Sequence, residues 1–300
     1  MGQVIDTAEN NMLPFFSIII PTKDRESYLK RCLDSILMQS FENFEILLVN
    51  DGEEFESEIP QIHALDTKLM VLDSGKHGVS NARNAGMHEA NGQYLIFLDD
   101  DEYFDAEHLN TLYTFYTESK NKNVISKSGT LLIRQDGTSV KEGNFTKKDS
   151  LLPQVWKYGA SMSDYCFPKG IKDRFNFEYS KSFIEDFVFL NKALTVFPST
   201  FLGHYSVLIE DHETRISYLK FKIPGLSYVN ELSAIESAID FHHIHSSSNL
   251  LGWKIPVKKI VASTYVYSKR AAKKGDVISV LRILGRGFLS VIRFTLKRIL

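Results

Sequence analysis

The chain has 300 residues, of which 43% are hydrophobic and 24% are charged, and this composition excludes wholesale disorder. Its only cysteines, Cys32 and Cys166, are too few for a disulfide framework and form no CxxC pair, which predicts a reducing compartment without structural zinc. The formal net charge of −2 conceals a polarity, because the residues from Lys254 onward contain twelve Lys or Arg and one acidic residue, Asp276. The sequence therefore predicts an acidic body and a basic tail.

The N-terminal residues 1–13 are polar and lack the basic region and apolar stretch of a secretion signal. No window of the sequence reaches the roughly 18 apolar residues that a spanning helix needs. We therefore expect a chain that is soluble or bound to a membrane surface rather than threaded through a membrane.

Predicted strands and helices alternate along the first hundred residues. Short apolar runs predict strands at 15–21, 44–49, 69–72 and 94–98, and helical spacing of apolar residues predicts helices at 26–40 and 77–90. Strands that alternate with helices imply right-handed crossovers and a parallel sheet that is covered on both faces.

Beyond this region, the sequence Gln135-Asp136-Gly137 predicts a hairpin, and residues 183–194 have the pattern of a helix. The aromatic residues between Trp156 and Phe177 are expected in the core, with stacking on acceptor sugars as the alternative. After about residue 220 the pattern becomes helical and increasingly basic.

Polar residues directly follow three of the predicted strands. Thr22, Asp24 and Arg25 follow the first strand, Asp51 follows the second, and the run 99–101 follows the fourth. Ligands bind at the carboxyl ends of the strands in a sheet of this kind, so these residues should converge on one crevice.

Three successive aspartates, Asp99, Asp100 and Asp101, end the fourth strand. Their carboxylates repel one another, and a divalent cation would remove the repulsion. Hard oxygen ligands suit Mn²⁺ or Mg²⁺, which share their coordination shell with substrate phosphates. The alternative is a solvated acidic loop, which the position at a strand end makes the weaker interpretation.

Asp51 and Arg83 are further candidates for binding a nucleotide. A carboxylate at Asp51 can accept a hydrogen bond from a ring N–H of a base, although an ordinary Asp-Gly turn explains the same residues. Arg83, in GVSNARNAG at 78–86, offers forked donors to a phosphate or a base edge, and a surface arginine is the alternative.

Taken together, these motifs resemble glycosyltransferase family 2, whose catalytic domain is called GT-A. The resemblance rests on SIIIPTKDR (17–25), EILLVNDG (45–52), GVSNARNAG (78–86), LDDDE (98–102) and IED (184–186), in family order. It implies an α/β fold of the Rossmann-like GT-A type, with a mostly parallel central sheet flanked by helices. We expect this catalytic domain at 1–220 and a helical, basic C-terminal region at 221–300.

The resemblance also implies a role for individual residues. The donor would be bound by Pro21, Thr22, Asp24, Arg25, Asp51, Arg83, Asp99 and Asp100. The metal, Mn²⁺ or Mg²⁺, would be held chiefly by Asp101, with Asp99 and His212 beside it, although His212 is equally explained as a solvated loop residue. Asp186 would be the general base, with Glu185 as the close alternative. One departure is Glu53-Glu54, where many members have serine after the Asp-Gly turn, and it leaves the local turn and donor choice open.

The implied activity is inverting transfer of a sugar from a nucleotide-diphosphate donor to a hydroxyl group. UDP is favoured by family habit, and the acceptor would be a glycan or lipid-linked molecule in bacterial cell-surface polysaccharide synthesis. One alternative is a catalytically silent nucleotide- or glycan-binding protein on the same scaffold. Another is a sugar-nucleotide pyrophosphorylase, but IIIPTKDRESYL lacks the glycine-rich basic loop of that class.

The C-terminal segment 277–300 interleaves basic residues with Ile, Leu, Val and Phe. A basic amphipathic helix of this kind fits the interface of an anionic membrane, and docking on a partner or on the acidic body is the alternative. Its apolar content is too high for a nucleic-acid-binding arm. The expected location is therefore cytoplasmic, at the inner face of the cell membrane.

Overall fold

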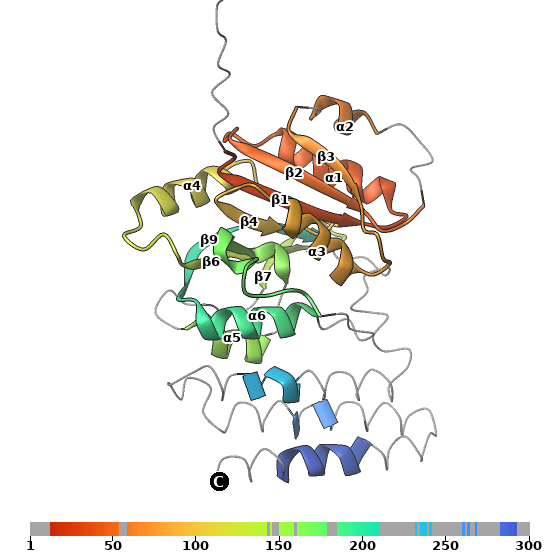
Figure 1. Ribbon diagram of the computed structural model, residues 1–300, viewed down its shortest axis with the longest axis vertical. Coiled ribbons are helices and arrows are strands. Elements are labelled where there is room, and N and C mark those ends of the chain that lie inside the picture. Colours follow the sequence, from red (N-terminus) through yellow and green to blue (C-terminus); the bar gives the residue numbers. More distant parts are fainter. Residues whose placement is uncertain are drawn as a thin grey trace, which may run out of the picture.

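The computed structural model describes residues 13–53, 59–65, 67–142, 145, 150–158, 161–178 and 185–210. It also describes shorter pieces at 232, 235–238, 240–241, 260–261, 263–264, 268 and 283–292. The first set forms the sheet and its covering helices (Figure 1).

Nine strands form one curled sheet in this part of the chain. The strands are β1 Phe16–Thr22, β2 Phe44–Asn50, β3 Leu69–Asp73, β4 Tyr94–Phe97, β5 Glu102–Phe104, β6 Ile125–Ile133, β7 Ser139–Glu142, β8 Tyr165–Pro168 and β9 Ser199–Glu210. Their order is β3-β2-β1-β4-β8-β6-β9-β5, with β7 paired to β6. The pairs among β3, β2, β1 and β4 are parallel, and β8 then joins β4 in the antiparallel direction.

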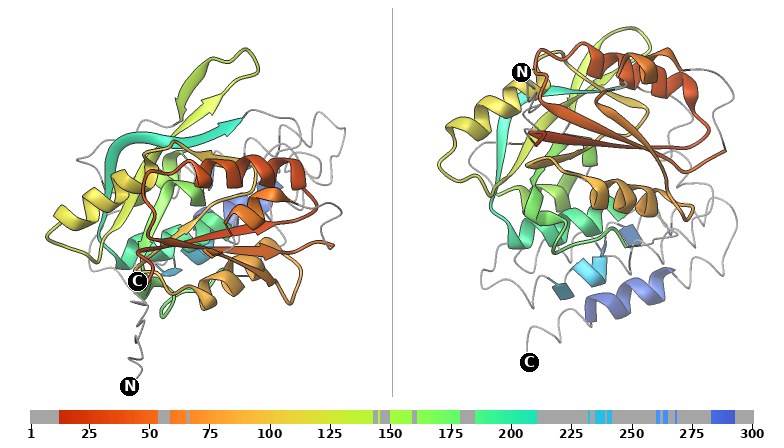
Figure 2. Two further views of the ribbon diagram at one scale, coloured as in Figure 1. Left: turned by 90° about the horizontal axis from the view of Figure 1, so that it is seen from above. Right: turned by 45° about the horizontal axis from the view of Figure 1, so that its top comes forward.

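Helices cover both faces of the sheet, as Figure 2 shows. They are α1 Glu26–Leu37, α2 Pro60–Ala64, α3 Val79–Glu89, α4 His108–Glu118, α5 Leu151–Tyr158 and α6 Glu185–Val196, with short 3₁₀ turns η1 Met162–Asp164 and η2 Lys169–Ile171. Successive residues of a strand point to opposite faces. Ile18 and Ile20 of β1 accordingly pack with α1 and α4, whereas Ile19 packs with α3, α5 and α6.

The structure confirms the elements that the sequence predicts for the first hundred residues, with small shifts at their ends. The helix predicted at 26–40 ends at Leu37, and the strand predicted at 94–98 ends at Phe97. The hairpin around 135–137 is confirmed as β6 and β7. The sheet as a whole, however, is mixed: besides β3-β2-β1-β4, the β6–β9 pair is parallel, whereas β8, β7 and β5 run antiparallel to their neighbours.

Most of the aromatic stretch is core, as the sequence predicts. Trp156, Tyr165, Phe167 and Phe177 are buried, and the ring of Phe177 stacks on that of Phe189 with centroids 4.1 Å apart. Among the described residues of this stretch, these rings therefore serve packing rather than an open binding surface.

The described pieces between residues 232 and 292 are helical. The boundary predicted at residue 220 lies outside the described residues, as does His212. None of the helices in the described part of the chain is both long and apolar enough to cross a membrane.

Candidate active site at the β1–β4 switch point

The candidate site lies where β1 and β4 stop pairing. The ladder between them ends at Ile19 and Phe97, with a last hydrogen bond from the Leu98 N–H to the Ile19 carbonyl oxygen at 2.9 Å. Pro21 follows on the same side of β1, and it has no N–H with which to extend the ladder. β1 thus stays paired to β2 while β4 turns away, and the strand order reverses at this point. Ligands bind at such switch points in open α/β sheets.

The loop after β4 is anchored through Asp100. The Thr22 hydroxyl donates to Asp100 Oδ2 at 2.8 Å, and the Arg25 guanidinium pairs with both Asp100 and Asp101, reaching Asp101 Oδ2 at 3.0 Å. Burial raises the pKa of Asp100 to about 7, although Arg25 and the Thr22 hydrogen bond act to lower it. The structure therefore turns Asp100 inward, where its carboxylate ties the loop to β1 and α1.

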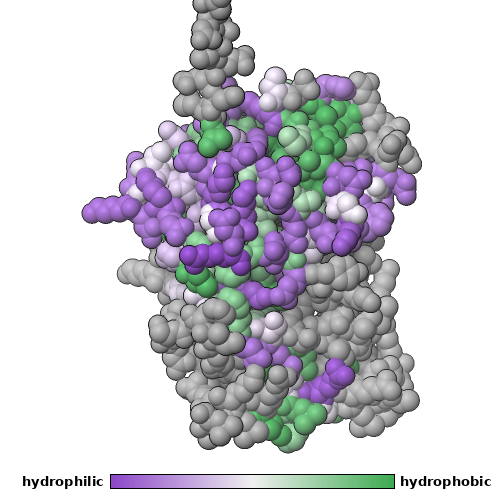
Figure 3. All heavy atoms as spheres, viewed as in Figure 1, coloured by the Kyte–Doolittle hydropathy of each residue, from purple (hydrophilic) through white to green (hydrophobic). Residues whose placement is uncertain are grey.

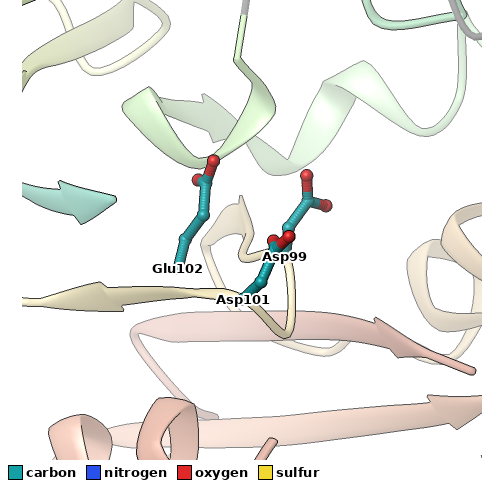
Figure 4. Close-up of side chains that lie close together, drawn as sticks. All are labelled: Asp99, Asp101 and Glu102. Carbon is teal, nitrogen blue, oxygen red and sulfur yellow. The ribbon is translucent and has the colours of Figure 1, made fainter. Parts of the chain in front are cut away.

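The other three acidic side chains of the loop converge. Asp99, Asp101 and Glu102 each offer one carboxylate oxygen, and these oxygens lie within 4.8 Å of one another (Figure 4). The backbone supplies the geometry, because the Glu102 N–H donates to the Asp99 carbonyl oxygen at 3.0 Å and closes a turn. Figure 4 shows Glu102 extending from the start of β5 toward the same region as the two aspartates.

Glu102 is the site residue that the sequence analysis missed. It stands in the motif LDDDE, three residues after Asp99, which is the spacing that a tight turn brings together. Its carboxylate is buried beside the Ser161 hydroxyl at 3.3–3.4 Å. Burial raises its pKa well above the ordinary value, and the nearby charges of Asp99 and Asp101 raise it further.

A divalent cation fits this donor set. Three carboxylates that repel one another in a partly buried loop are the hard oxygen ligands that Mn²⁺ and Mg²⁺ prefer. Of the residues predicted to hold the metal, the structure brings Asp99 and Asp101 together. It adds Glu102, which none of the sequence patterns had singled out.

Asp51 fixes the start of α3. Its carboxylate accepts hydrogen bonds from the Gly78 N–H at 2.8 and 2.9 Å and from the Ser74 hydroxyl at 2.9 Å. Gly78 has φ 119°, a conformation that favours glycine, and it directly precedes the helix. The side chain predicted to bind a base therefore also aligns α3 with the end of β2. Its contact with a base stays a prediction.

Asp24 organises the turn that contains Glu53. Its Oδ1 accepts from the Glu53 N–H at 3.1 Å, and a Cβ on Gly52 would stand 2.1 Å from that same oxygen. Asn50 closes the turn by donating to the Glu53 carbonyl oxygen at 2.8 Å. Both hydrogen bonds involve backbone atoms of Glu53, and its side chain is exposed. These bonds therefore do not depend on the residue type at 53.

Arg83 joins the two ends of the site. It is buried on α3, and its guanidinium donates to Asp99 Oδ1 at 2.7 Å and to Asp186 Oδ1 at 2.6 Å. Glu185 Oε1 lies 3.4 Å from the same nitrogen that donates to Asp186. Burial acts to lower the pKa of Arg83, but the three carboxylates outweigh it and raise the pKa above the ordinary value.

The residues proposed for metal binding and for base catalysis are thus brought to one place, although they are 87 positions apart in the sequence. Glu185 and Asp186 form the first turn of α6, where the helix dipole stabilises negative charge. Arg83 was expected to face a donor. In this structure both its terminal nitrogens instead meet carboxylates, so its first role is to hold Asp99 and Asp186 together.

Sequence comparison identifies the first part of this site. The model of the family "Glycosyl transferase family 2" matches residues 17–143. The glycosyltransferase GlyA of Streptococcus pneumoniae is 35% identical over 99 residues, which are 32% of this chain and 14% of GlyA. The uncharacterised glycosyltransferase EpsJ of Bacillus subtilis is 35% identical over 120 residues, 39% of this chain and 34% of EpsJ. The chain therefore matches only about a third or less of the length of these two relatives.

Solved structures extend the likeness to nearly the whole chain. TarS 1–349 of S. aureus, in complex with UDP-GlcNAc, superposes with a TM-score of 0.54 over 89% of this chain and 90% of its own, at 18% identity. The mannosyltransferase PcManGT of Pyrobaculum calidifontis, in complex with GDP-Man and Mn²⁺, has a TM-score of 0.53 over 94% and 88% of the two chains, at 12% identity. These similarities establish the fold. The chain thus has the GT-A fold of these neighbours, and its residues 17–143 match the model of glycosyl transferase family 2.

Proposed function

We propose that the chain is a metal-dependent, inverting glycosyltransferase that uses a nucleotide-diphosphate sugar. One observation carries the proposal: Arg83 holds Asp99 and Asp186 at 2.7 and 2.6 Å, next to the cluster of Asp99, Asp101 and Glu102. A candidate base and a candidate cation site therefore flank one crevice at the switch point of the sheet. Inverting transfer needs these two parts, a proton acceptor and a stabiliser of the departing diphosphate.

In the proposed reaction the acceptor hydroxyl oxygen attacks the anomeric carbon of the donor. The bond between that carbon and the phosphate oxygen breaks, and the nucleoside diphosphate leaves with the bonding electrons. Asp186 takes the proton of the hydroxyl, with Glu185 as the alternative base. Asp99, Asp101 and Glu102 would hold Mn²⁺ or Mg²⁺, which supplies Lewis-acid stabilisation of the leaving group when it is bound.

For the donor, we propose a UDP-sugar. TarS, which shares the fold, has been captured with UDP-GlcNAc, and this supports a uridine nucleotide. PcManGT shares the fold as well and is bound to GDP-Man, so the nucleotide has to be established by assay. Within the site, Thr22 ends β1, and Asp24 and Asp51 follow β1 and β2, where the nucleotide would bind.

For the acceptor, we propose a glycan or a lipid-linked molecule in the synthesis of a bacterial cell-surface polysaccharide, made at the cytoplasmic face of the membrane. The basic C-terminal segment supports this part of the proposal, because an enzyme that works on a lipid-linked acceptor benefits from residing at the membrane surface.

The decisive experiment is donor hydrolysis by the purified chain across UDP-, GDP- and dTDP-sugars, with and without Mn²⁺. We expect metal-dependent release of one nucleotide. Asp186→Asn should reduce the rate by about 10²–10⁴-fold, the usual contribution of a general base, while donor binding measured by calorimetry changes little. Asp173→Asn, an exposed aspartate outside the site, is the matched control and should retain full activity.

Glu185→Gln separates the two candidate bases, because only loss of the true base abolishes turnover with donor binding preserved. If no sugar nucleotide is hydrolysed and calorimetry detects no metal-dependent nucleotide binding, the proposal fails and the scaffold is catalytically silent.

A further inference from the structure

The helix at 283–292 has one face that is fixed to the body of the molecule. Ile283, Gly287 and Ser290 are buried, and Ile283 belongs to the same core cluster as residues of α5 and α6. The Ser290 hydroxyl donates to Glu236 Oε1 at 2.6 Å. This packing fixes the rotation of the helix about its axis, and the opposite face is therefore exposed on the surface of the molecule.

That outer face is apolar. Leu284, Phe288, Leu289 and Ile292 are 47%, 67%, 64% and 38% exposed. The spacing of four residues from 284 to 288 to 292 places three of them in one stripe along the helix. Surface helices ordinarily turn such a stripe toward the core. Here Ile283, Gly287 and Ser290 pack inward, yet four further large apolar residues point outward, an arrangement that indicates a surface covered by something else.

The position of the helix makes the stripe accessible. Helix 283–292 lies at the end of the molecule, on the far side of α5 and α6 from β1 and β2, in Figure 1 and in the right-hand view of Figure 2. Figure 3 shows hydrophobic side chains gathered at that end of the surface.

Charge selects the partner. Arg286 is exposed within the helix, and the surrounding segment 277–300 contains five basic residues and no acidic one. From Lys254 to the C-terminus the formal charge is +11. Large apolar side chains beside cations are the features by which a helix binds the interface of an anionic bilayer: the apolar residues enter the acyl region and the cations contact the headgroups.

We propose that helix 283–292 docks the chain on an anionic lipid surface, with Leu284, Phe288, Leu289 and Ile292 inserted and Arg286 at the headgroups. The inference does not rest on glycosyl transfer, since a silent scaffold would dock through the same surface. It identifies the face and the side chains that make the contact, which the amino-acid pattern of the tail did not decide.

The test is cosedimentation of the full chain with vesicles of phosphatidylglycerol and phosphatidylcholine, compared with vesicles of phosphatidylcholine alone. Wild-type protein should bind the anionic vesicles, and the double variant Phe288→Gln and Leu289→Gln should lose about tenfold or more in binding, because two apolar side chains no longer enter the bilayer. The matched control is Met70→Gln with Val71→Thr on β3, whose side chains are 50% and 48% exposed and whose substitution should leave vesicle binding unchanged.

Circular dichroism and thermal unfolding in the absence of vesicles verify that the variants are folded. Wild-type protein that fails to bind anionic vesicles overturns the proposal, and so does equal binding by the 288/289 variant. Concentration-dependent association of the wild type that the variant abolishes, without vesicle binding, would assign the surface to a second copy of the chain and overturn it as well.

Discussion

β1 and β6 are both buried strands of one sheet, yet they bury different kinds of side chain. β1, with the sequence FSIIIPT, is apolar along most of its length. β6, with the sequence ISKSGTLLI, buries Ser126, Lys127, Ser128 and Thr130. β1 belongs to the parallel half of the sheet, β1–β4 with α1–α3, and β6 to the mixed half, β5–β9 with α4–α6.

In the mixed half, the buried polar groups are paired with segments far away in the sequence. The Lys127 ammonium pairs with the Asp164 carboxylate of η1, which also accepts from the Thr130 hydroxyl. The Tyr116 hydroxyl bonds to Ser126 Oγ at 3.0 Å and to the Cys166 carbonyl oxygen at 3.1 Å. The contrast teaches that β1 is held mainly by apolar burial, whereas β6 depends on particular polar pairs, because a buried polar group without a partner is costly.

The largest expected effect comes from breaking the Lys127–Asp164 pair. Lys127→Met leaves the Asp164 carboxylate buried without its cation, which should lower the free energy of unfolding by about 3–5 kcal/mol. Urea denaturation measures this. The double variant Lys127→Met with Asp164→Leu should recover most of the loss, since an apolar pair replaces the ion pair. In the parallel half, Ile18→Val should cost only about 1 kcal/mol. If Lys127→Met were as stable as the wild type, the buried ion pair of β6 would contribute no stability, and the distinction between β6 and β1 would be lost.

Arg83 connects the halves, and a double-mutant cycle measures that connection. Arg83→Met and Asp186→Asn, singly and together, should show a coupling energy of about 2 kcal/mol in unfolding experiments, because the guanidinium is buried and donates directly to Asp186. The Arg25–Asp101 pair, whose arginine is 28% exposed, should couple more weakly. Additive effects of Arg83 and Asp186 would mean that the contact between the halves contributes no stability of its own.

Two glycines offer a matched pair for packing. A Cβ on Gly86 of α3 would lie 2.5 Å from Ile19 Cγ2, in the parallel half, where neighbouring side chains are fully buried. Gly86→Ala should therefore destabilise by about 1–2 kcal/mol. A Cβ on Gly129 of β6 would meet the ring of Tyr205, which is partly exposed and can rotate outward, so Gly129→Ala should cost less. Thermal unfolding of the two variants compares them, and a larger loss for Gly129→Ala would contradict the expectation.

Near neutral pH, the smallest effect is a pH dependence that originates in the mixed half. Burial, with a smaller contribution from His204, lowers the pKa of His108 to about 3, whereas an unfolded histidine titrates near pH 6.5. Between these values the unfolded state binds the proton more readily, so stability falls as the pH decreases below about 6.5, by about 1 kcal/mol per pH unit. His108→Gln should flatten this part of the stability curve, whereas His88→Gln, at an exposed site of the parallel half, should not.

The parallel half could be predicted from the sequence because its signals are local. Apolar runs such as that of 44–49 marked the strands, and the polar residues after them, including Thr22 and Asp51, lie at the strand ends as expected. β8, β9 and α5 were not predicted. In β9, apolar and polar residues do not alternate regularly, and the burial of this strand depends on its pairing with both β6 and β5.

The sequence by itself determined the fold class, the four parallel strands and the set of acidic residues that follow them. These follow from apolar periodicity and from turn residues, which act over a few positions. Tertiary structure alone decided how those acids are used. Asp100 turns inward to Thr22 and Arg25, Glu102 joins Asp99 and Asp101, and Arg83 gathers Asp99 and Asp186. Each of these outcomes depends on burial and on charges brought together from distant segments, and no local pattern encodes such contacts.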